Sequence, residues 1–232
     1  MYLTRFQFNP MRKEGGKLLE QRQYLHAAVL AGFADSAPTQ QGRVLWRIDK
    51  SGERRFLVLS SPRKPDLSHL VEQAGWPASE TTWETRDYKP LLDRLQEGQR
   101  WGFRLTANPT KSLRPEHGQK RGKVEGLGME SEQLDWLGDK SVRHGFSIVN
   151  QERNVMLVEG GGEATEEHTT ARVFESERVR FSRKNSTVTL QTASFDGVLE
   201  VIDTALLREA LTHGIGSAKG YGCGLMTLVP VG

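Results

Sequence analysis

A strand pattern that ends at an Asn-Pro pair occurs twice in this chain, once in each half. Apolar and polar residues alternate from Tyr2 to Phe8 and again from Arg100 to Ala107, which predicts two half-buried strands. Each strand is followed directly by Asn-Pro, at 9–10 and at 108–109, and proline cannot continue a strand ladder. The two halves are therefore expected to start with the same element and to fold alike.

After this first strand, the N-terminal half follows the order of a split βαββαβ unit. Apolar residues three and four apart predict an amphipathic helix from Glu20 to Phe33. Two strand-like segments, 44–48 and 55–59, are joined by the turn sequence Asp-Lys-Ser-Gly. A short helix capped by Asp66 and a fourth strand at 82–88 complete the unit.

The C-terminal half repeats this order with longer connections. After its first strand we expect a helix at 131–144 capped by Ser131, strand segments at 146–158 and 172–201, a helix at 204–213 and a last strand at 225–231. Gly160 to Glu167 is expected to form an acidic loop. The predicted fold class is α+β, with two tandem ferredoxin-like (RRM-like, βαββαβ) domains. We place the N-terminal domain at 1–89, a short helical linker at 90–98 and the C-terminal domain at 99–232.

Composition excludes several classes of protein. The 232 residues contain a single cysteine, Cys223, so an internal disulfide and a cysteine zinc site are excluded. No apolar run approaches the roughly 18 residues that a membrane-spanning helix needs. The N-terminal residues also lack the apolar core of a signal peptide. We therefore expect a cytoplasmic protein that does not enter a membrane.

Basic residues are unevenly distributed, although the formal net charge is only +3. Residues 100–123 include seven arginines and lysines and a single acid, Glu116. A local excess of positive charge predicts contact with a polyanion, although a solvated loop is an equally common explanation. The candidate binding residues in this stretch are Lys111, Arg114, Lys120 and Arg121.

Residues 178–190 predict a hairpin with one cationic face. The two-residue period of a strand turns Val179, Phe181, Val188 and Leu190 inward. Such a ribbon suits a phosphate backbone, which cationic side chains contact without reading sequence. The alternative is an ordinary hairpin with a soluble outer face. The candidate binding residues are Arg178 and Arg180 on the outer face, with Arg183 and Lys184 at the turn.

A glycine-rich run from Gly214 to Gly224 separates the last expected helix from the last strand. Glycine tolerates positive φ and close approach, and successive backbone N–H groups can form a concavity for an anion. Gly216 and Lys219 are therefore candidate binding residues. The spacing fits neither a Walker loop nor a dinucleotide fingerprint, because the run follows a helix instead of opening one. A tight helix-to-strand turn is the alternative.

His26 is the histidine best placed for acid–base chemistry. It flanks the apolar stripe of the first helix, and Arg22 and Gln23, two candidate binding residues, share its face. A neutral imidazole near a guanidinium can exchange protons at neutral pH, although a lone helix histidine is more often a surface or packing residue. The six histidines and the carboxylates show no metal-ligand spacing, so no cofactor or metal is expected.

Taken together, these residues resemble the CasE-type endoribonucleases, which process CRISPR repeat RNA in type I-E Cascade complexes. The resemblance spans nearly the whole chain in order. It is carried by Met1-Tyr2-Leu3, by His26, by Arg43-Val44-Leu45-Trp46-Arg47, by Arg104 to Pro109, by Gln133-Leu134-Asp135-Trp136-Leu137 and by Gly214 to Leu225. The family has two ferredoxin-like domains, in agreement with the repeat described above.

The resemblance implies a metal-independent cut at the base of a short RNA stem-loop. The 2′-OH of the RNA attacks the adjacent phosphate and leaves a 2′,3′-cyclic phosphate and a 5′-OH. His26 occupies the position of the catalytic histidine of the family. Some members carry a tyrosine three residues earlier, where this chain has Gln23, so Tyr24 is a second catalytic candidate. The implied partners are the CRISPR repeat stem-loop and other Cascade subunits.

Two other functions stay open from the sequence. A non-catalytic RNA-binding protein of tandem RRM-like domains would lack a dedicated base, but no RRM-type aromatic motif is present. A nucleotide-binding enzyme that used the glycine run would need a lysine at Walker spacing, which is absent.

Overall fold

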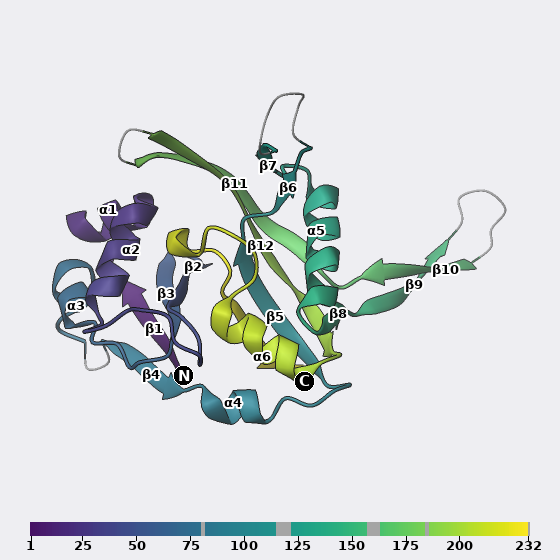
Figure 1. Cartoon of the computed structure of the whole chain (residues 1–232), viewed down its shortest axis with the longest axis horizontal. Coiled ribbons are helices and arrows are strands. Elements are labelled where there is room, and N and C mark those ends of the chain that lie inside the picture. The colour runs from purple at the N-terminus through teal and green to yellow at the C-terminus, as the bar shows by residue number, and fades with distance from the viewer. Residues whose placement is uncertain (80–81, 115–121, 157–162, 184–185, 232) are drawn as a thin grey trace.

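The computed structural model describes residues 1–79, 82–114, 122–156, 163–183 and 186–231. For 152–156, 163–167, 182–183 and 186 it describes the backbone alone. Two main antiparallel sheets lie side by side and are joined below by α4 (Figure 1). No described helix is both long enough and apolar enough to cross a membrane.

The N-terminal half forms one antiparallel sheet with helices on one face. Its elements are β1 (Tyr2–Phe8), α1 (Lys13–Glu20), α2 (Arg22–Ala31), β2 (Leu45–Ser51), β3 (Arg54–Ser61), α3 (Ser68–Ala74) and β4 (Trp83–Asp87). The strand order is β2-β3-β1-β4. Leu25 and Val29 of α2 and Leu70 of α3 are buried against Phe6 and Trp46 of the sheet. The sheet order and helix placement confirm the first ferredoxin-like unit.

The first helix differs from its prediction. The segment expected as one helix at 20–33 consists of two helices, because the backbone breaks at Gln21 (φ −113°, ψ 88°). α1 begins at Lys13. The sequence did not predict a helix here, because the segment contains two adjacent glycines and glycine lowers helix propensity. Gly15 is buried there, and a Cβ on it would lie 2.5 Å from the carbonyl oxygen of Asn9. The glycine is therefore needed for close packing of α1.

The C-terminal half repeats the same arrangement after α4 (Lys89–Asp93). Its main elements are β5 (Arg100–Ala107), α5 (Glu130–Arg143), β8 (Phe146–Ile148), β11 (Arg172–Arg183), β12 (Ser186–Val201), α6 (Thr204–His213) and β13 (Met226–Pro230). The sheet order is β11-β12-β5-β13, and β8 also pairs with β12. This is the ferredoxin-like order with the second strand divided between β8 and β11, so the predicted fold class is confirmed.

The second unit contains three further short elements. They are the hairpin β6 (Thr110–Ser112) with β7 (Val124–Gly126), the hairpin β9 (Asn150–Met156) with β10 (Glu163–Thr169), and the 3₁₀ turn η1 (Lys219–Tyr221). β10 corrects the expectation of an acidic loop, since residues 163–167 pair with β9; Gly160–Gly162 lie outside the described residues. The break expected near Asn150–Asn154 comes at Val149 instead.

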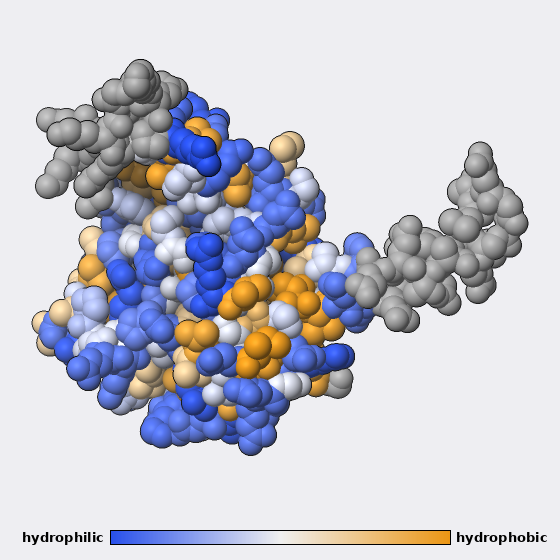
Figure 2. Space-filling model, turned by 45° about the vertical axis from the view of Figure 1, so that its right-hand side comes forward, coloured by the Kyte–Doolittle hydropathy of each residue, from blue (hydrophilic) through white to orange (hydrophobic). Residues whose placement is uncertain are grey.

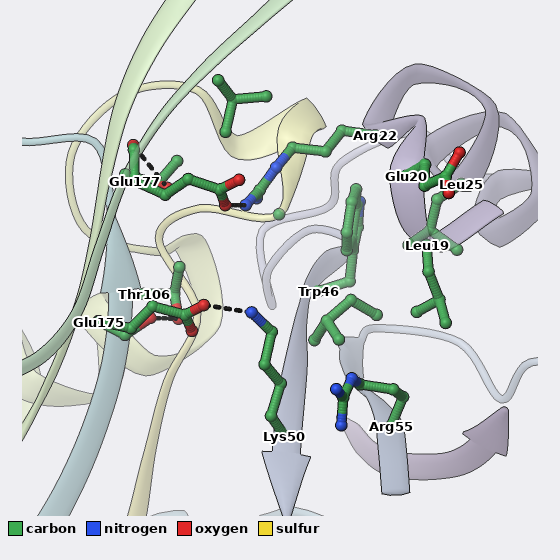
Figure 3. Close-up of a pocket in the computed structure, with 15 residues that line it drawn as sticks. Leu19, Glu20, Arg22, Leu25, Trp46, Lys50, Arg55, Thr106, Glu175 and Glu177 are labelled. Carbon is green, nitrogen blue, oxygen red and sulfur yellow. Dashed lines mark hydrogen bonds and ion pairs between the residues drawn. The ribbon is translucent and has the colours of Figure 1, made fainter. Parts of the chain in front are cut away.

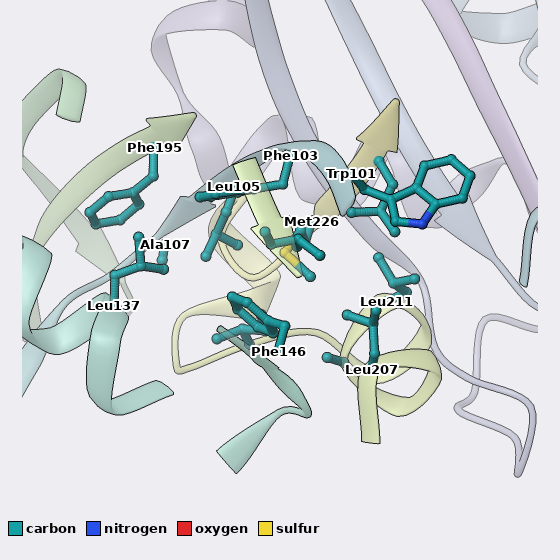
Figure 4. Packing of buried hydrophobic residues seen from close by; sticks show 14 of the residues in the cluster. Trp101, Phe103, Leu105, Ala107, Leu137, Phe146, Phe195, Leu207, Leu211 and Met226 are labelled. Carbon is teal, nitrogen blue, oxygen red and sulfur yellow. The ribbon is translucent and has the colours of Figure 1, made fainter. Parts of the chain in front are cut away.

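The core of the second unit lies between its sheet and the helices α5 and α6 (Figure 4). Leu105 and Phe195 of the sheet are fully buried, and Leu137 and Leu207 pack on them from the two helices. Trp136 of α5 stacks on Phe195 with ring centroids 6.2 Å apart. The expected cap Ser131 is wrong, because α5 starts one residue earlier with Met129 at its N-cap.

Polar contacts hold the two units against each other. Arg47 of β2 is 3% exposed and donates hydrogen bonds to Leu225 O and Thr227 Oγ1 of the second unit. Most of the surface in Figure 2 is hydrophilic around a smaller hydrophobic area. The division into 1–89, 90–98 and 99–232 stays a prediction.

Candidate active site

The glycine run forms a loop of unusual backbone conformation between α6 and β13. φ is positive at Gly214, Gly216, Ala218, Gly222 and Gly224. Ala218 (φ 59°) is the one non-glycine residue with positive φ in the described part of the chain. Backbone held in this region costs energy and often marks a functional segment. The loop is tied to the second sheet, because the Gly224 N–H donates to Thr106 O at 2.7 Å.

The loop packs its glycines against aromatic rings of the first unit. A Cβ on Gly222 would lie 2.6 Å from the indole of Trp46, and one on Gly220 would lie 3.3 Å from His26 Nε2. These glycines are therefore needed for contact between the units, as well as for the turn itself. The contact brings the histidine predicted from the first half to the loop predicted from the second.

His26 lies on α2, one position after the buried Leu25, and is half-buried. Its Nδ1 accepts a hydrogen bond of 3.2 Å from Trp46 Nε1. Burial, and then the positive charge of Arg43, lower the pKa of His26 below 6.5. The neutral form of the ring therefore predominates at pH 7.

A group of cations that includes Arg43 lies near this histidine. Burial and the charges of Arg43 and Lys140 lower the pKa of Lys219, so each of these two cations lies close enough to Lys219 to repel it. The Nε of Arg43 is buried and has no hydrogen-bond partner among the described residues. Arg43 and Trp46 were not predicted as site residues, although both lie in the segment that carried the family resemblance.

The remaining α2 candidates lie around His26 in different ways. Arg22 donates to the carbonyl oxygen of Tyr221 at 2.9 Å and lies 3.8 Å from a carboxylate oxygen of Glu177. Gln23 is exposed on the helix surface. Tyr24 is 52% exposed, and the ammonium of Lys17 lies 5.5 Å from its ring centroid. The structure therefore brings Arg22 to the glycine loop and directs Tyr24 toward α1.

The β11–β12 hairpin has the register predicted from its alternation. Val179 pairs with Leu190 and Phe181 with Val188, and Phe181 packs on Tyr221 of the glycine loop at 4.8 Å. Arg178 and Arg180 are exposed on the other face. Arg178 also lines a groove of about 500 Å³ beside the β6–β7 hairpin. The side chain of Arg183 and the whole of Lys184 lie outside the described residues.

The basic stretch of the second unit is only partly described. Lys111 lies on β6 and forms an ion pair with Glu132 of α5 at 3.1 Å. Arg114 is exposed, whereas Lys120 and Arg121 lie outside the described residues. Gly216 supports Trp136, whose ring would be 3.1 Å from a Cβ on that glycine. Its carbonyl oxygen accepts a hydrogen bond from the ammonium of Lys219.

A cleft of about 360 Å³ lies between the two units, below the glycine loop (Figure 3). Trp46 forms part of its wall, and Lys50 pairs across it with Glu175 as Arg22 does with Glu177 (Figure 3). These ion pairs offset the charges of Lys50 and Arg22, whereas Arg43 and Lys219 form no ion pair with a described residue. Within the described residues, no three His, Cys, Asp or Glu side chains gather to hold a metal ion.

Comparison with known proteins identifies the family. A model of the family described as "CRISPR associated protein" matches residues 1–230. The chain belongs to this family. It is 25% identical to the CRISPR-associated endoribonuclease Cse3 of Thermus thermophilus, over 99% of this chain and 100% of that one. It is 29% identical to the CRISPR system Cascade subunit CasE of Escherichia coli, over 90% of this chain and 100% of that one.

The fold of the family is shared as well. The solved structure of Thermus thermophilus Cse3 bound to an RNA representing a pre-cleavage complex superposes with a TM-score of 0.75. That likeness has 24% identity and covers 99% of this chain and 98% of the other. The resemblance to the CasE type is therefore confirmed for both sequence and fold.

Proposed function

We propose that this chain is an endoribonuclease that cleaves CRISPR precursor RNA at the base of the repeat stem-loop and so yields mature guide RNA. The observation that carries the proposal is a half-buried His26 whose pKa is lowered by burial and by the charge of Arg43, and whose Nε2 lies beside Gly220 of the glycine loop. The name of the Thermus relative supports endoribonuclease activity.

The proposed reaction needs neither water nor a metal ion. The 2′ oxygen bonds to the adjacent phosphorus and the bond from phosphorus to the 5′ oxygen breaks, which gives a 2′,3′-cyclic phosphate and a 5′-OH. One proton leaves the 2′-OH and one arrives at the 5′ oxygen, so the proton balance closes. His26 acts at the reacting phosphate, either in proton transfer or as a hydrogen-bond donor, and Lys219 and Arg43 stabilise the negative charge that gathers on the phosphate. Tyr24 is not part of the proposed site.

The stem-loop is proposed to bind mainly through its backbone. The major groove of A-form RNA is too deep and narrow for ordinary side-chain readout, so shape and phosphate contacts dominate. The exposed Arg178 and Arg180 of β11 suit such contacts because they share the outer face of the hairpin. We further propose that the chain works in the cytoplasm with other Cascade subunits, in keeping with the name of the Escherichia relative.

The test is cleavage of a labelled repeat stem-loop by wild type and His26→Ala in EDTA. We expect wild type to cut in the chelator and to leave a cyclic phosphate. His26→Ala should cut about a hundredfold more slowly or worse, the scale of lost acid–base catalysis, while it still binds the hairpin. His168→Ala is the matched control, since His168 is an exposed histidine of the β9–β10 hairpin.

Two results would contradict this proposal. Wild-type cleavage by His26→Ala would remove His26 from the reaction, and binding without any cleavage by wild type would favour a non-catalytic tandem RRM-like RNA-binding protein. Activity that EDTA abolishes and magnesium restores would refute the metal-independent reaction.

A further inference from the structure

The contact between Trp46 and His26 restricts the proton positions on the imidazole. The indole Nε1 lies 3.2 Å from His26 Nδ1, and the two rings are 24° from parallel with centroids 6.4 Å apart. An indole N–H can only donate a hydrogen bond. His26 Nδ1 must therefore present its lone pair, and the proton of the neutral ring is on Nε2.

Trp46 is firmly held in this position. It is 1% exposed, and its residue on β2 pairs with Leu59 of β3. The backbone of Gly222 covers the ring so closely that a Cβ there would lie 2.6 Å away. The indole N–H therefore keeps its direction toward Nδ1, because neither the strand nor the loop leaves room for another rotamer.

The other ring nitrogen, Nε2, lies beside the glycine loop. A Cβ on Gly220 would be 3.3 Å from Nε2, so a side chain at this position would occupy the space in front of the ring edge. Gly220 does not have a positive φ. Its value to the site is therefore the space it leaves at Nε2.

We propose that Trp46 is a positioning residue that fixes the neutral His26 ring in the Nε2–H tautomer, so that His26 meets the RNA as a hydrogen-bond donor to an oxygen of the scissile phosphate. The proposal rests on the proposed function for its RNA step. A base at Nε2 would need the proton on Nδ1, where it would oppose the indole N–H. The imidazolium would meet the same opposition, so the neutral donor is the form that Trp46 favours.

The deciding measurement is ¹⁵N NMR of the histidine side chains in the RNA-free full chain, with His26 assigned from the spectrum of His26→Gln. In wild type we expect the proton on Nε2 and an unprotonated Nδ1. Trp46→Phe keeps an aromatic ring and removes the donor, so we expect more Nδ1–H tautomer and a higher pKa of His26. Trp76→Phe is the matched control, because the Trp76 N–H donates to Phe8 O.

Cleavage of bound stem-loop provides the second readout. Trp46→Phe should slow the single-turnover rate about fivefold, which corresponds to about 1 kcal/mol, the worth of one ordinary hydrogen bond. Binding of the stem-loop should not change, because the Trp46 side chain is buried and offers RNA almost no surface. Gly220→Ala should slow cleavage more strongly and leave the tautomer as in wild type.

The outcomes separate this proposal from the proposed function. A wild-type His26 that carries its proton on Nδ1 overturns the proposal without any variant, and so does Trp46→Phe with unchanged tautomer and pKa. Wild type that binds the stem-loop without cutting it refutes the proposed function and with it the donor role of His26, whatever the tautomer.

Discussion

Replacing Arg47 with methionine should destabilise the chain by breaking the buried contact between its two halves. The Arg47 guanidinium donates to both carboxylate oxygens of Asp49, at 2.7 and 2.9 Å. It also donates to Thr227 Oγ1 at 2.8 Å and to the carbonyl oxygens of Leu225 and Arg104 at 3.3 and 3.4 Å. Methionine retains the apolar stem and removes all of these donors.

The expected loss follows from burial. Removing one partner of a buried ion pair costs about 3–5 kcal/mol, because the remaining charge stays uncompensated. The side chain of Asp49 is 19% exposed, so water relieves part of this cost. We therefore expect a loss near the lower end, about 3 kcal/mol in the free energy of unfolding. For a chain of this length that corresponds to a fall in Tm of about 6–12 °C.

Urea and thermal unfolding of wild type and Arg47→Met would measure this loss. Arg5→Met is the matched control, because it makes the same chemical change in a surface pair. Arg5 lies 3.6 Å from Glu84, and the two side chains are 59% and 46% exposed. Such a pair contributes at most about 1 kcal/mol.

The double variant Arg47→Met, Asp49→Leu tests the reason for the loss. Removing both charges leaves no buried ion, so the double variant should regain part of the stability that the single variant loses. A loss below about 1 kcal/mol in Arg47→Met would refute the reasoning. Additive losses in the double variant would show that the two charges are not coupled.

Three further predictions concern binding, pH and the glycine positions. Alanine at both Arg178 and Arg180 should weaken binding to matched and scrambled stems alike. In a salt titration of affinity, the slope of log K should fall by just under one unit per lost contact, and an unchanged slope would place the RNA elsewhere. Because the pKa of His26 is lowered from 6.5, the unfolded chain binds more protons just below that pH. The free energy of unfolding should therefore fall as the pH falls from 6.5 toward the lowered pKa, and it should fall less in His26→Gln. Urea titrations at several pH values would measure this, and equal losses in wild type and His26→Gln would exclude the linkage. Gly216→Ala places a side chain at φ 78° and should lower the free energy of unfolding by about 1–2 kcal/mol. Gly138→Ala places its Cβ in open space on α5 and should raise the free energy of unfolding by about 0.5–1 kcal/mol. Equal effects of the two alanines would contradict the different roles given to these two glycines.

The spacing of apolar residues along the chain predicted most of the fold, because the side chains that are buried in the strands and helices follow the same spacing. The alternation at 100–107 and 178–190 gave the strands and the facing of Arg178 and Arg180 correctly. It failed at α1, where Gly15 and Gly16 lower helix propensity, although Gly15 allows the helix to approach Asn9. The split of the second strand at Val149 is set by pairing with β12, which sequence spacing does not report.

The site was predicted only as far as single segments allow. His26 and the glycine loop were each recognised from local pattern, but their contact depends on how the two units dock. Trp46 lies on β2 and Arg43 just before that strand, and both reach the site through tertiary packing, so local pattern does not mark them. Tyr24 was a candidate from the family resemblance, because some members carry a tyrosine at the position of Gln23, yet a regular helix separates the side chains of Tyr24 and His26 by about 200°.

The β9–β10 hairpin projects from the body as a sheet of its own (Figure 1). At its base, the Thr170 N–H donates to Val149 O at 3.0 Å and the Val149 N–H donates to Val198 O at 2.9 Å. These bonds close the main sheet across the point where the hairpin leaves it, between Asn150 and Thr169. The chain length beyond that point is therefore free to change in evolution without moving β8 or β11. A reporter domain spliced between β9 and β10 should fold beside an intact enzyme, since its attachment points are cross-strand neighbours.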